Sequence, residues 1–544
     1  MLYNHMTKQI SGEEAILWGA KKANFGYISS YPDILTKERL NKNYHVLSSQ
    51  SPVIQLNRNS RNAFEQAIGA AYGGTRSLIY LKNSDFFSLI DTIIATSLRK
   101  TRMSGLVIAL IDDSPNRHAV SIDSRKFFPI LNIPLLEPSN PLEGYEMTCE
   151  AFSISEAYQI LVALRLRSGY QTMTDAIEIE PNGDIKPINS DYSKYAHLDI
   201  HDNDMDETLA RLRLIVEQSP FNNLIGHGEH RMIVSGYLFQ KLKGIISHDL
   251  NEKYLILKLG TIYPLPEMMI KQLLRESESV LVLEEGSPFI ESMIMDIVQK
   301  YKLNTRIYSN PKNHFSNARE IQTWELEELL NKFIPGYQTN VVFFPYKEKS
   351  TTVRNLPVCA GCDFHTLFSS LKRSLDSIKG KKPLLIGDGG CSLLLDKPPY
   401  KLLDIANPPG SAIAIATGMS KHKPSKKFIV ITDSEAFFQE GINALLTAVQ
   451  SNVNMTVIIL DKIGDEVVTC YQKVDDDISI NMSQSSRLSL QQIIESYSIS
   501  QVFTLDFEGF SDIEKTFHMT LDYKGLSVII VKAKCIINNL IYES

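Results

Sequence analysis

Cysteine is scarce in this chain, and the few residues present form no run typical of an iron–sulfur protein. The six cysteines of the 544 residues are Cys149, Cys359, Cys362, Cys391, Cys470 and Cys535. A ferredoxin-like module needs four-cysteine runs of the CxxCxxC kind, and the sequence has none. We therefore expect no iron–sulfur cluster in this chain, so electrons from any redox reaction would leave through another subunit. A disulfide framework is equally unexpected.

Long apolar runs and a strong net charge are missing as well. No window approaches the roughly 20 uninterrupted apolar residues of a membrane span. The N-terminus MLYNHMTKQISGEE lacks the apolar region of a signal peptide. A formal net charge of -6 gives no support for non-specific nucleic-acid binding. We expect a cytoplasmic protein with neither a nucleic acid nor a membrane as its partner.

Four turn-like motifs follow one another in the C-terminal third of the chain. They are CAGC (359–362), GDGGC (387–391), PPGSAIAIATG (408–418) and ITDSEAFFQEGINALLTAV (431–449). The apolar strand MTVIILDK then ends at Lys462. An α/β sheet presents ligand-binding loops in this way, at the carboxyl ends of its strands. Acidic loops at Asp433 and Asp461 could there hold a cation and the diphosphate that it neutralises.

Strands and helices alternate almost throughout the sequence, which predicts an α/β fold of parallel sheets flanked by helices. At roughly 150 residues a domain, the length allows three to four domains. We expect three, at 1–175, 226–340 and 341–544, with a polar linker or insertion at 176–225.

The order of these motifs resembles the alpha subunit of indolepyruvate ferredoxin oxidoreductase, a thiamine diphosphate enzyme that oxidatively decarboxylates aryl 2-oxo acids to acyl-CoA. The family's pieces read CPGC, GDIGC, MGAS, GDSTFFHTGIPAL and LDN. Upstream segments such as AFEQAIGAAYGGTRSLIYLK and VLVLEEGSPFIE extend the resemblance to nearly the whole chain. It implies a pyrimidine-binding-type domain, a transketolase-C-terminal-like domain and a diphosphate-binding-type domain, in that order. It also implies a homodimer, with a smaller beta-type subunit as a further partner.

The resemblance assigns a thiamine diphosphate site residue by residue. Asp433 and the backbone carbonyl of Gly464 correspond to ligands of its metal ion, Mg²⁺, and His365 is a candidate catalytic residue. The remaining cofactor-binding residues are expected to be Cys359, Gly361, Cys362, Gly387, Asp388, Gly389, Cys391, Gly410, Ser411, Ser434 and Lys462. Without the resemblance, Asp433 would be interpreted as an N-cap at a βα turn, and the CxxC as a zinc half-site or a redox pair.

Two substitutions fall where the family's chemistry depends on one side chain. Lys462 replaces an asparagine ligand, and an ammonium group has donors only, so it cannot ligate Mg²⁺. It could pair with Asp433 and take over the cation's role, or fill a site that has lost its function. Ser60 replaces the glutamate that activates the cofactor's aminopyrimidine ring, and a hydroxyl is too weak a base for that step.

Two functions stay open at this point. The first is a thiamine diphosphate-dependent conversion of a 2-oxo acid, with an aryl pyruvate as a candidate, by decarboxylation, acyl transfer or oxidation through an external electron acceptor. The second is a catalytically impaired binding or scaffolding subunit. The C-terminal motifs favour the first, and Ser60 and Lys462 favour the second.

The polar turn 112–125 is a separate candidate site. Its Arg117 or Arg125 could bind an anion, with a solvated loop as the alternative.

Overall fold

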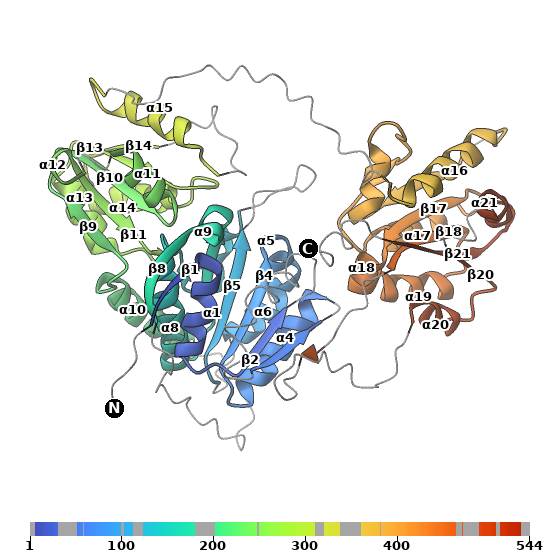
Figure 1. Ribbon diagram of the computed structural model, residues 1–544, viewed down its shortest axis with the longest axis horizontal. Helices are drawn as coiled ribbons and strands as arrows, with labels where there is room; N and C mark the ends of the chain where they lie inside the picture. Colours follow the sequence, from blue (N-terminus) through green and yellow to red (C-terminus); the bar gives the residue numbers. More distant parts are fainter. Residues whose placement is uncertain are drawn as a thin grey trace. The chain divides into compact units, whose positions relative to one another are not determined.

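The computed structural model divides into two compact units, shown in Figure 1 and described separately below. The first contains Met1–Phe344 and Cys470–Asn481, and the second Pro345–Thr469 and Met482–Ser544. The structure describes residues 6–30, 52–57, 59–98, 103–112, 123–179, 202–246, 250–309, 320–337, 361–380, 382–463, 470–471, 489–506 and 512–534.

The larger sheet of the first unit has eight strands in the order β12-β6-β7-β5-β4-β2-β3-β19. Its inner strands are parallel, and β12 and β19 pair antiparallel at the two edges. The central strand β5 is apolar almost throughout (LVIALID) and buried along its whole length, as expected of a parallel strand covered on both faces. The strands are β2 (Tyr27–Ser30), β3 (Val53–Leu56), β4 (Ser77–Lys82), β5 (Leu106–Asp112), β6 (Leu135–Leu136), β7 (Val162–Arg167), β12 (Thr261–Tyr263) and β19 (Cys470–Tyr471).

A second sheet of the first unit has five strands in the order β14-β13-β10-β11-β9, all parallel except β9. Its strands are β9 (Asn223–Gly226), β10 (His230–Ser235), β11 (Tyr254–Leu259), β13 (Ser279–Leu283) and β14 (Arg306–Tyr308). A separate antiparallel pair is formed by β1 (Met6–Ser11) and β8 (Thr174–Ile179).

Three helices of the first unit begin at a polar residue whose side chain caps the first turn: Ser11 before α1, Asn59 before α4 and Asn140 before α8. In α1, for example, the Ser11 hydroxyl accepts a hydrogen bond from the Glu14 amide and the Glu14 carboxylate accepts one from the Ser11 amide, a capping box. Among the described residues no helix has the length and apolar character needed to cross a bilayer. The longer helices are α1 (Gly12–Lys22), α4 (Ser60–Tyr72), α6 (Ile90–Leu98), α8 (Pro141–Tyr158), α10 (Asp202–Glu217), α11 (Leu238–Ile246), α13 (Glu267–Arg275), α14 (Ile290–Tyr301) and α15 (Thr323–Phe333).

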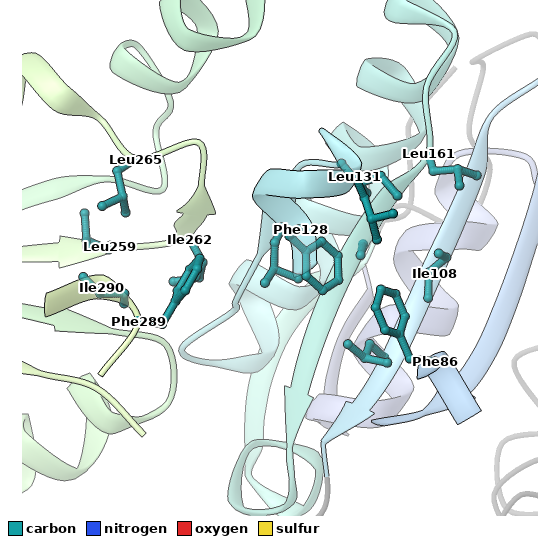
Figure 2. Packing of buried hydrophobic residues seen from close by; sticks show 14 of the residues in the cluster. Phe86, Ile108, Phe128, Leu131, Leu161, Leu259, Ile262, Leu265, Phe289 and Ile290 are labelled. Atoms are coloured by element: carbon teal, nitrogen blue, oxygen red, sulfur yellow. The ribbon is translucent and has the colours of Figure 1, made fainter. Parts of the chain in front are cut away.

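The two sheets of the first unit share one hydrophobic cluster, part of which is drawn in Figure 2. Phe128 lies in its middle and stacks on Phe86, with ring centroids 5.2 Å apart. Leu259 and Ile290, from the second sheet and its helix α14, belong to the same cluster.

The predicted polar segment 176–225 differs from a simple linker, because it contains α10 and most of β9.

The second unit is built on a sheet of six strands in the order β16-β15-β17-β18-β21-β20, all parallel. Side chains alternate between two hydrophobic clusters, one on each face: Ile429 and Ile431 of β17 enter one, and Phe428 and Val430 the other. The predicted α/β class with parallel sheets flanked by helices is confirmed in both units. The strands are β15 (Leu384–Gly387), β16 (Ile405–Ala406), β17 (Phe428–Asp433), β18 (Met455–Ile463), β20 (Gln501–Leu505) and β21 (Leu526–Lys534). The helices include α16 (Phe364–Ser377), η3 (Gly390–Asp396), α17 (Ala412–His422), α18 (Ser434–Ala436), η4 (Phe437–Gly441), α19 (Ile442–Gln450), α20 (Leu490–Glu495) and α21 (Ile513–Asp522).

Candidate functional site

The polar motifs of the second unit meet at the carboxyl edge of its sheet. β15 and β18 both pair with β17, with Gly387 opposite Ile431 and Asp433 opposite Leu460. Asp388 therefore follows β15 at the edge where Asp433 ends β17. Ligand-binding loops of open α/β sheets lie at this edge.

Asp388 is fully buried and fixes the start of helix α17. One carboxylate oxygen, Oδ2, accepts a hydrogen bond of 3.0 Å from the Ala412 amide. The other oxygen, Oδ1, is buried without a hydrogen-bond partner. The pKa of Asp388 is raised to about 6, mainly by burial; the negative charge of Asp433 adds to this rise and hydrogen bonds to the carboxylate oppose it.

Asp433 binds the neighbouring GDGGC turn. Its oxygens accept hydrogen bonds from the amides of Cys391 (2.9 Å) and Ser392 (3.3 Å), and the residue is 1% exposed. Asp433 occupies the N-cap position of the short helix α18, at a βα turn as the alternative interpretation expects, but its side chain makes no capping hydrogen bond there. Its assignment as a metal ligand stays a prediction.

Glycines of two motifs allow close approaches that a side chain would prevent. Gly390 has a φ of +52°, and a Cβ there would lie 2.0 Å from Asp433 Oδ2. Gly410 has a φ of +81°, and a Cβ there would lie 2.7 Å from Glu440 Cβ. The Ser392 hydroxyl closes the turn by donating to the Gly389 carbonyl.

The remaining predicted residues of these motifs have structural contacts of their own. Ser411, before α17, donates its hydroxyl to the Pro408 carbonyl, and Ser434 is buried at the start of α18. The turn Phe437–Gly441 that follows is a π-helix. Between Asp433 and Gly441 this chain has one residue more than the family's GDSTFFHTG pattern. A π-turn accommodates such an insertion within a helix.

The CxxC motif leads into helix α16, where His365 contacts a residue that the sequence did not single out. His365 Nδ1 lies 2.7 Å from the Tyr400 hydroxyl, and Tyr400 is buried. Cys362, beside Gly361 (φ +84°), and Cys391 are half-buried and pack against the hydrophobic cluster that contains Ile429 and Ile431. The described residues contain no group of three or more metal-ligating side chains, so they offer no support for the zinc interpretation.

Ser60 belongs to the first unit, where it is the first residue of α4. Its side chain is buried, and its hydroxyl lies 3.4 Å from that of Ser88. Cys359 and Gly464 lie outside the described residues. The backbone of Lys462 is part of β18, opposite Ala533, and its side chain is outside the description.

A buried charge network in the first unit was not predicted. Arg125 is fully buried and paired with Asp123 (2.5 Å) and Glu284 (2.7 Å), so the expectation of a solvated loop is wrong for this residue. Arg165 pairs in the same way with Asp112 (2.6 Å) and Glu137 (2.7 Å). The EE pair of the VLVLEEGSPF segment was the available signal, because carboxylates directly after a buried strand require partners.

Comparisons with known proteins match one segment of the chain to a family and nearly the whole chain to one group of relatives. Residues 388–531 match the family described as "Thiamine pyrophosphate enzyme, C-terminal TPP binding domain". Over 562 residues the chain is 25% identical to the indolepyruvate oxidoreductase subunit IorA of Pyrococcus abyssi, covering 96% of this chain and 85% of that protein. Over 547 residues it is 23% identical to the subunit of the same name from Methanothermobacter thermautotrophicus, covering 97% and 87%. A solved 2-oxoglutarate:ferredoxin oxidoreductase from Magnetococcus marinus aligns with 12% identity and a TM-score of 0.48, over 60% of this chain and 65% of that one.

Residues 388–531, most of which lie in the second unit, are thus similar to a thiamine pyrophosphate-binding domain. Along nearly its whole length, the chain is a relative of the indolepyruvate oxidoreductase subunit IorA proteins, and the resemblance found in the sequence is confirmed.

Proposed function

We propose that this chain is the thiamine diphosphate-binding subunit of an oxidoreductase that acts on a 2-oxo acid, with an aryl pyruvate such as indolepyruvate as the substrate. The names of its relatives support the reaction class and the idea that the chain works with a second subunit. In this proposal the electrons are passed to that second subunit, the smaller beta-type partner. We further propose that the chain forms a homodimer in the cytoplasm.

The observation that carries this proposal is the contact between the two motif loops within the matched segment. The GDGGC turn supplies the amides of Cys391 and Ser392, and the next strand supplies Asp433, which binds them. An amide pair in a glycine turn is an anion-binding arrangement. Because these two amides already donate to the anionic carboxylate of Asp433, they are suited to donate to a diphosphate.

The described residues fit the cofactor in two further respects. Asp388 Oδ1 is a buried acceptor without a partner, beside a second carboxylate. Mg²⁺ is commonly bound by one or two carboxylates together with phosphate oxygens. A carboxylate offers about four acceptor positions, so Asp433 can hold an ion once the diphosphate has replaced it at the two amides.

In the proposed site the amides of residues 391 and 392 hold the diphosphate. Asp433 and the Gly464 carbonyl hold Mg²⁺, or Lys462 supplies the positive charge in its place. Cys359, Gly361, Cys362, Gly387, Gly389, Gly410, Ser411 and Ser434 shape the surrounding loops. Thiamine diphosphate, when bound, supplies the electron sink for cleavage of the bond between the carboxylate and the 2-oxo carbon. His365 is positioned by Tyr400 to move a proton.

The test combines the purified chain with its partner subunit, thiamine diphosphate, Mg²⁺ and indolepyruvate or phenylpyruvate. We expect CO₂ release and substrate-dependent reduction of a viologen dye, both absent when thiamine diphosphate is omitted. Cofactor binding without any CO₂ release would instead support the impaired binding subunit, to which Ser60 points.

A further inference from the structure

The GDGGC turn of the second unit already binds an anionic group of the protein itself, the carboxylate of Asp433. Asp433 Oδ2 accepts from the Cys391 amide at 2.9 Å and Oδ1 accepts from the Ser392 amide at 3.3 Å. With Asp433 only 1% exposed, these bonds form away from competing water. Hydrogen bonds from amides to a charged acceptor are stronger than neutral ones.

The turn is shaped for this carboxylate. Gly390 is the first residue of the 3-10 turn η3 and adopts a left-handed conformation, which lets the amides that follow it point toward one acceptor. A Cβ on Gly390 would lie 2.0 Å from Asp433 Oδ2, so the carboxylate fills the space that a side chain would take. The Ser392 hydroxyl, bonded to the Gly389 carbonyl at 2.7 Å, keeps the turn closed around it.

Each backbone amide has one hydrogen, so an amide that donates to Asp433 cannot make a second bond of full strength. We propose that Asp433 and the cofactor's diphosphate compete for the amides of Cys391 and Ser392, so that Asp433 must turn away before the diphosphate binds there. Asp433 thereby sets the affinity of the site for anions. This inference rests on the proposed function, and it adds a way in which the protein regulates anion binding at the same site.

Asp388 provides a matched control for this competition. It is a second buried carboxylate at the same edge of the sheet, but its oxygen accepts from the Ala412 amide instead of the amides of the turn. Removing the charge of Asp388 changes the local electrostatic potential, but the amides of residues 391 and 392 still donate to Asp433. A comparison of the two positions therefore separates competition for the amides from general repulsion between anions.

The experiment titrates inorganic diphosphate into the full chain by calorimetry in the presence of EDTA, at fixed ionic strength. The proteins are the parent, Asp433→Ala, the nearly isosteric Asp433→Asn and Asp388→Asn. We expect Asp433→Ala to bind diphosphate at least tenfold more tightly than the parent, because its two amides are released. Asp433→Asn should gain less, and Asp388→Asn should gain less than Asp433→Ala, because it releases neither amide of the turn.

An Asp433→Ala affinity equal to or below that of the parent would overturn the proposal, and so would an equal gain in Asp388→Asn. If Asp433→Ala does not fold, the same comparison is made with Asp433→Asn. Failure of the proposed function has a different signature: the parent would not respond to thiamine diphosphate with Mg²⁺, while the gain of the Asp433 variants for inorganic diphosphate would persist.

Discussion

Arg125 and Glu284 form a buried ion pair that joins the two sheets of the first unit. Arg125 Nη1 lies 2.7 Å from Glu284 Oε2, and the two side chains are 0% and 6% exposed. The same guanidinium donates to Asp123 and to the Ser287 carbonyl, and it lies over the ring of Phe289. Burial raises the pKa of Glu284, and the charge of Arg125 opposes this rise.

Arg125→Met should lower the free energy of unfolding of the first unit by about 3–5 kcal/mol, because it leaves two buried carboxylates without their cation. Urea denaturation followed by circular dichroism measures this loss. Arg61→Met is the matched control, since Arg61 and its partner Asp91 are 42% and 67% exposed, and its effect should stay below about 1 kcal/mol. Equal effects of the two substitutions would show that the buried network does not stabilise the unit.

The environment of Lys427 predicts that the folding stability of the second unit depends on pH. Its ammonium donates to the carbonyls of Tyr523 and Gly525, and burial lowers its pKa from 10.5 to about 8. Between these two values the unfolded chain binds more protons than the folded one, so stability rises with pH across this window. Below pH 8 the cost of the buried charge is present in full.

The measurement is the midpoint of chemical unfolding from pH 7 to pH 10 for the parent and Lys427→Met. The parent should gain stability relative to this variant above pH 8. The exposed Lys423, four residues earlier, gives the control Lys423→Met, which should follow the parent. A constant difference between the parent and Lys427→Met would contradict the predicted titration.

Tyr400→Phe should change His365 without disturbing the packing around it. The substitution removes the hydroxyl that lies 2.7 Å from Nδ1 and keeps the ring that packs edge-on against Phe368. We expect a loss of about 1 kcal/mol in stability and a shift of the His365 ring ¹⁵N resonances. Unchanged resonances would exclude Tyr400 as the group that positions His365.

Ser60 tests whether the first unit can be returned to the family's chemistry. Ser60→Glu needs the room taken by the Ser88 hydroxyl, which lies 3.4 Å away, so it is combined with Ser88→Gly. A carboxylate there should accelerate exchange of the thiazolium C2 proton by at least tenfold, since general acid–base groups contribute about 10²–10⁴-fold. The control Ser60→Gln with Ser88→Gly has the same size and no base. Equal exchange rates in the two variants would contradict the assigned role of this position.

Much of the fold could be predicted because strands and helices are marked by local patterns of apolar residues in the sequence. Apolar runs such as FIVIT at 428–432 became buried parallel strands, and the loops after them meet at one edge, as the alternation of strands and helices predicts. Strand β12 was harder to place, because residues 261–263 lie in sequence between β11 and β13 of the second sheet but pair with β6 of the first.

The contacts within the site could not be predicted in the same way. The partners of Asp433 are backbone amides, which every residue but proline has, so no residue type marks them. Tyr400 lies 35 residues from His365, at the end of an irregular loop. Arg125 looked like a surface residue in a polar turn, and only its long-range partner Glu284 explains its burial.

The central claim, that the second unit binds thiamine diphosphate, is tested most directly by calorimetric titration of the purified chain with thiamine diphosphate and Mg²⁺. We predict saturable binding, together with a melting temperature that rises with cofactor concentration as RT ln(1 + [L]/Kd) requires. Thiamine, which lacks the diphosphate, should bind far more weakly. Absence of heat and of any thermal shift at millimolar thiamine diphosphate would contradict the account.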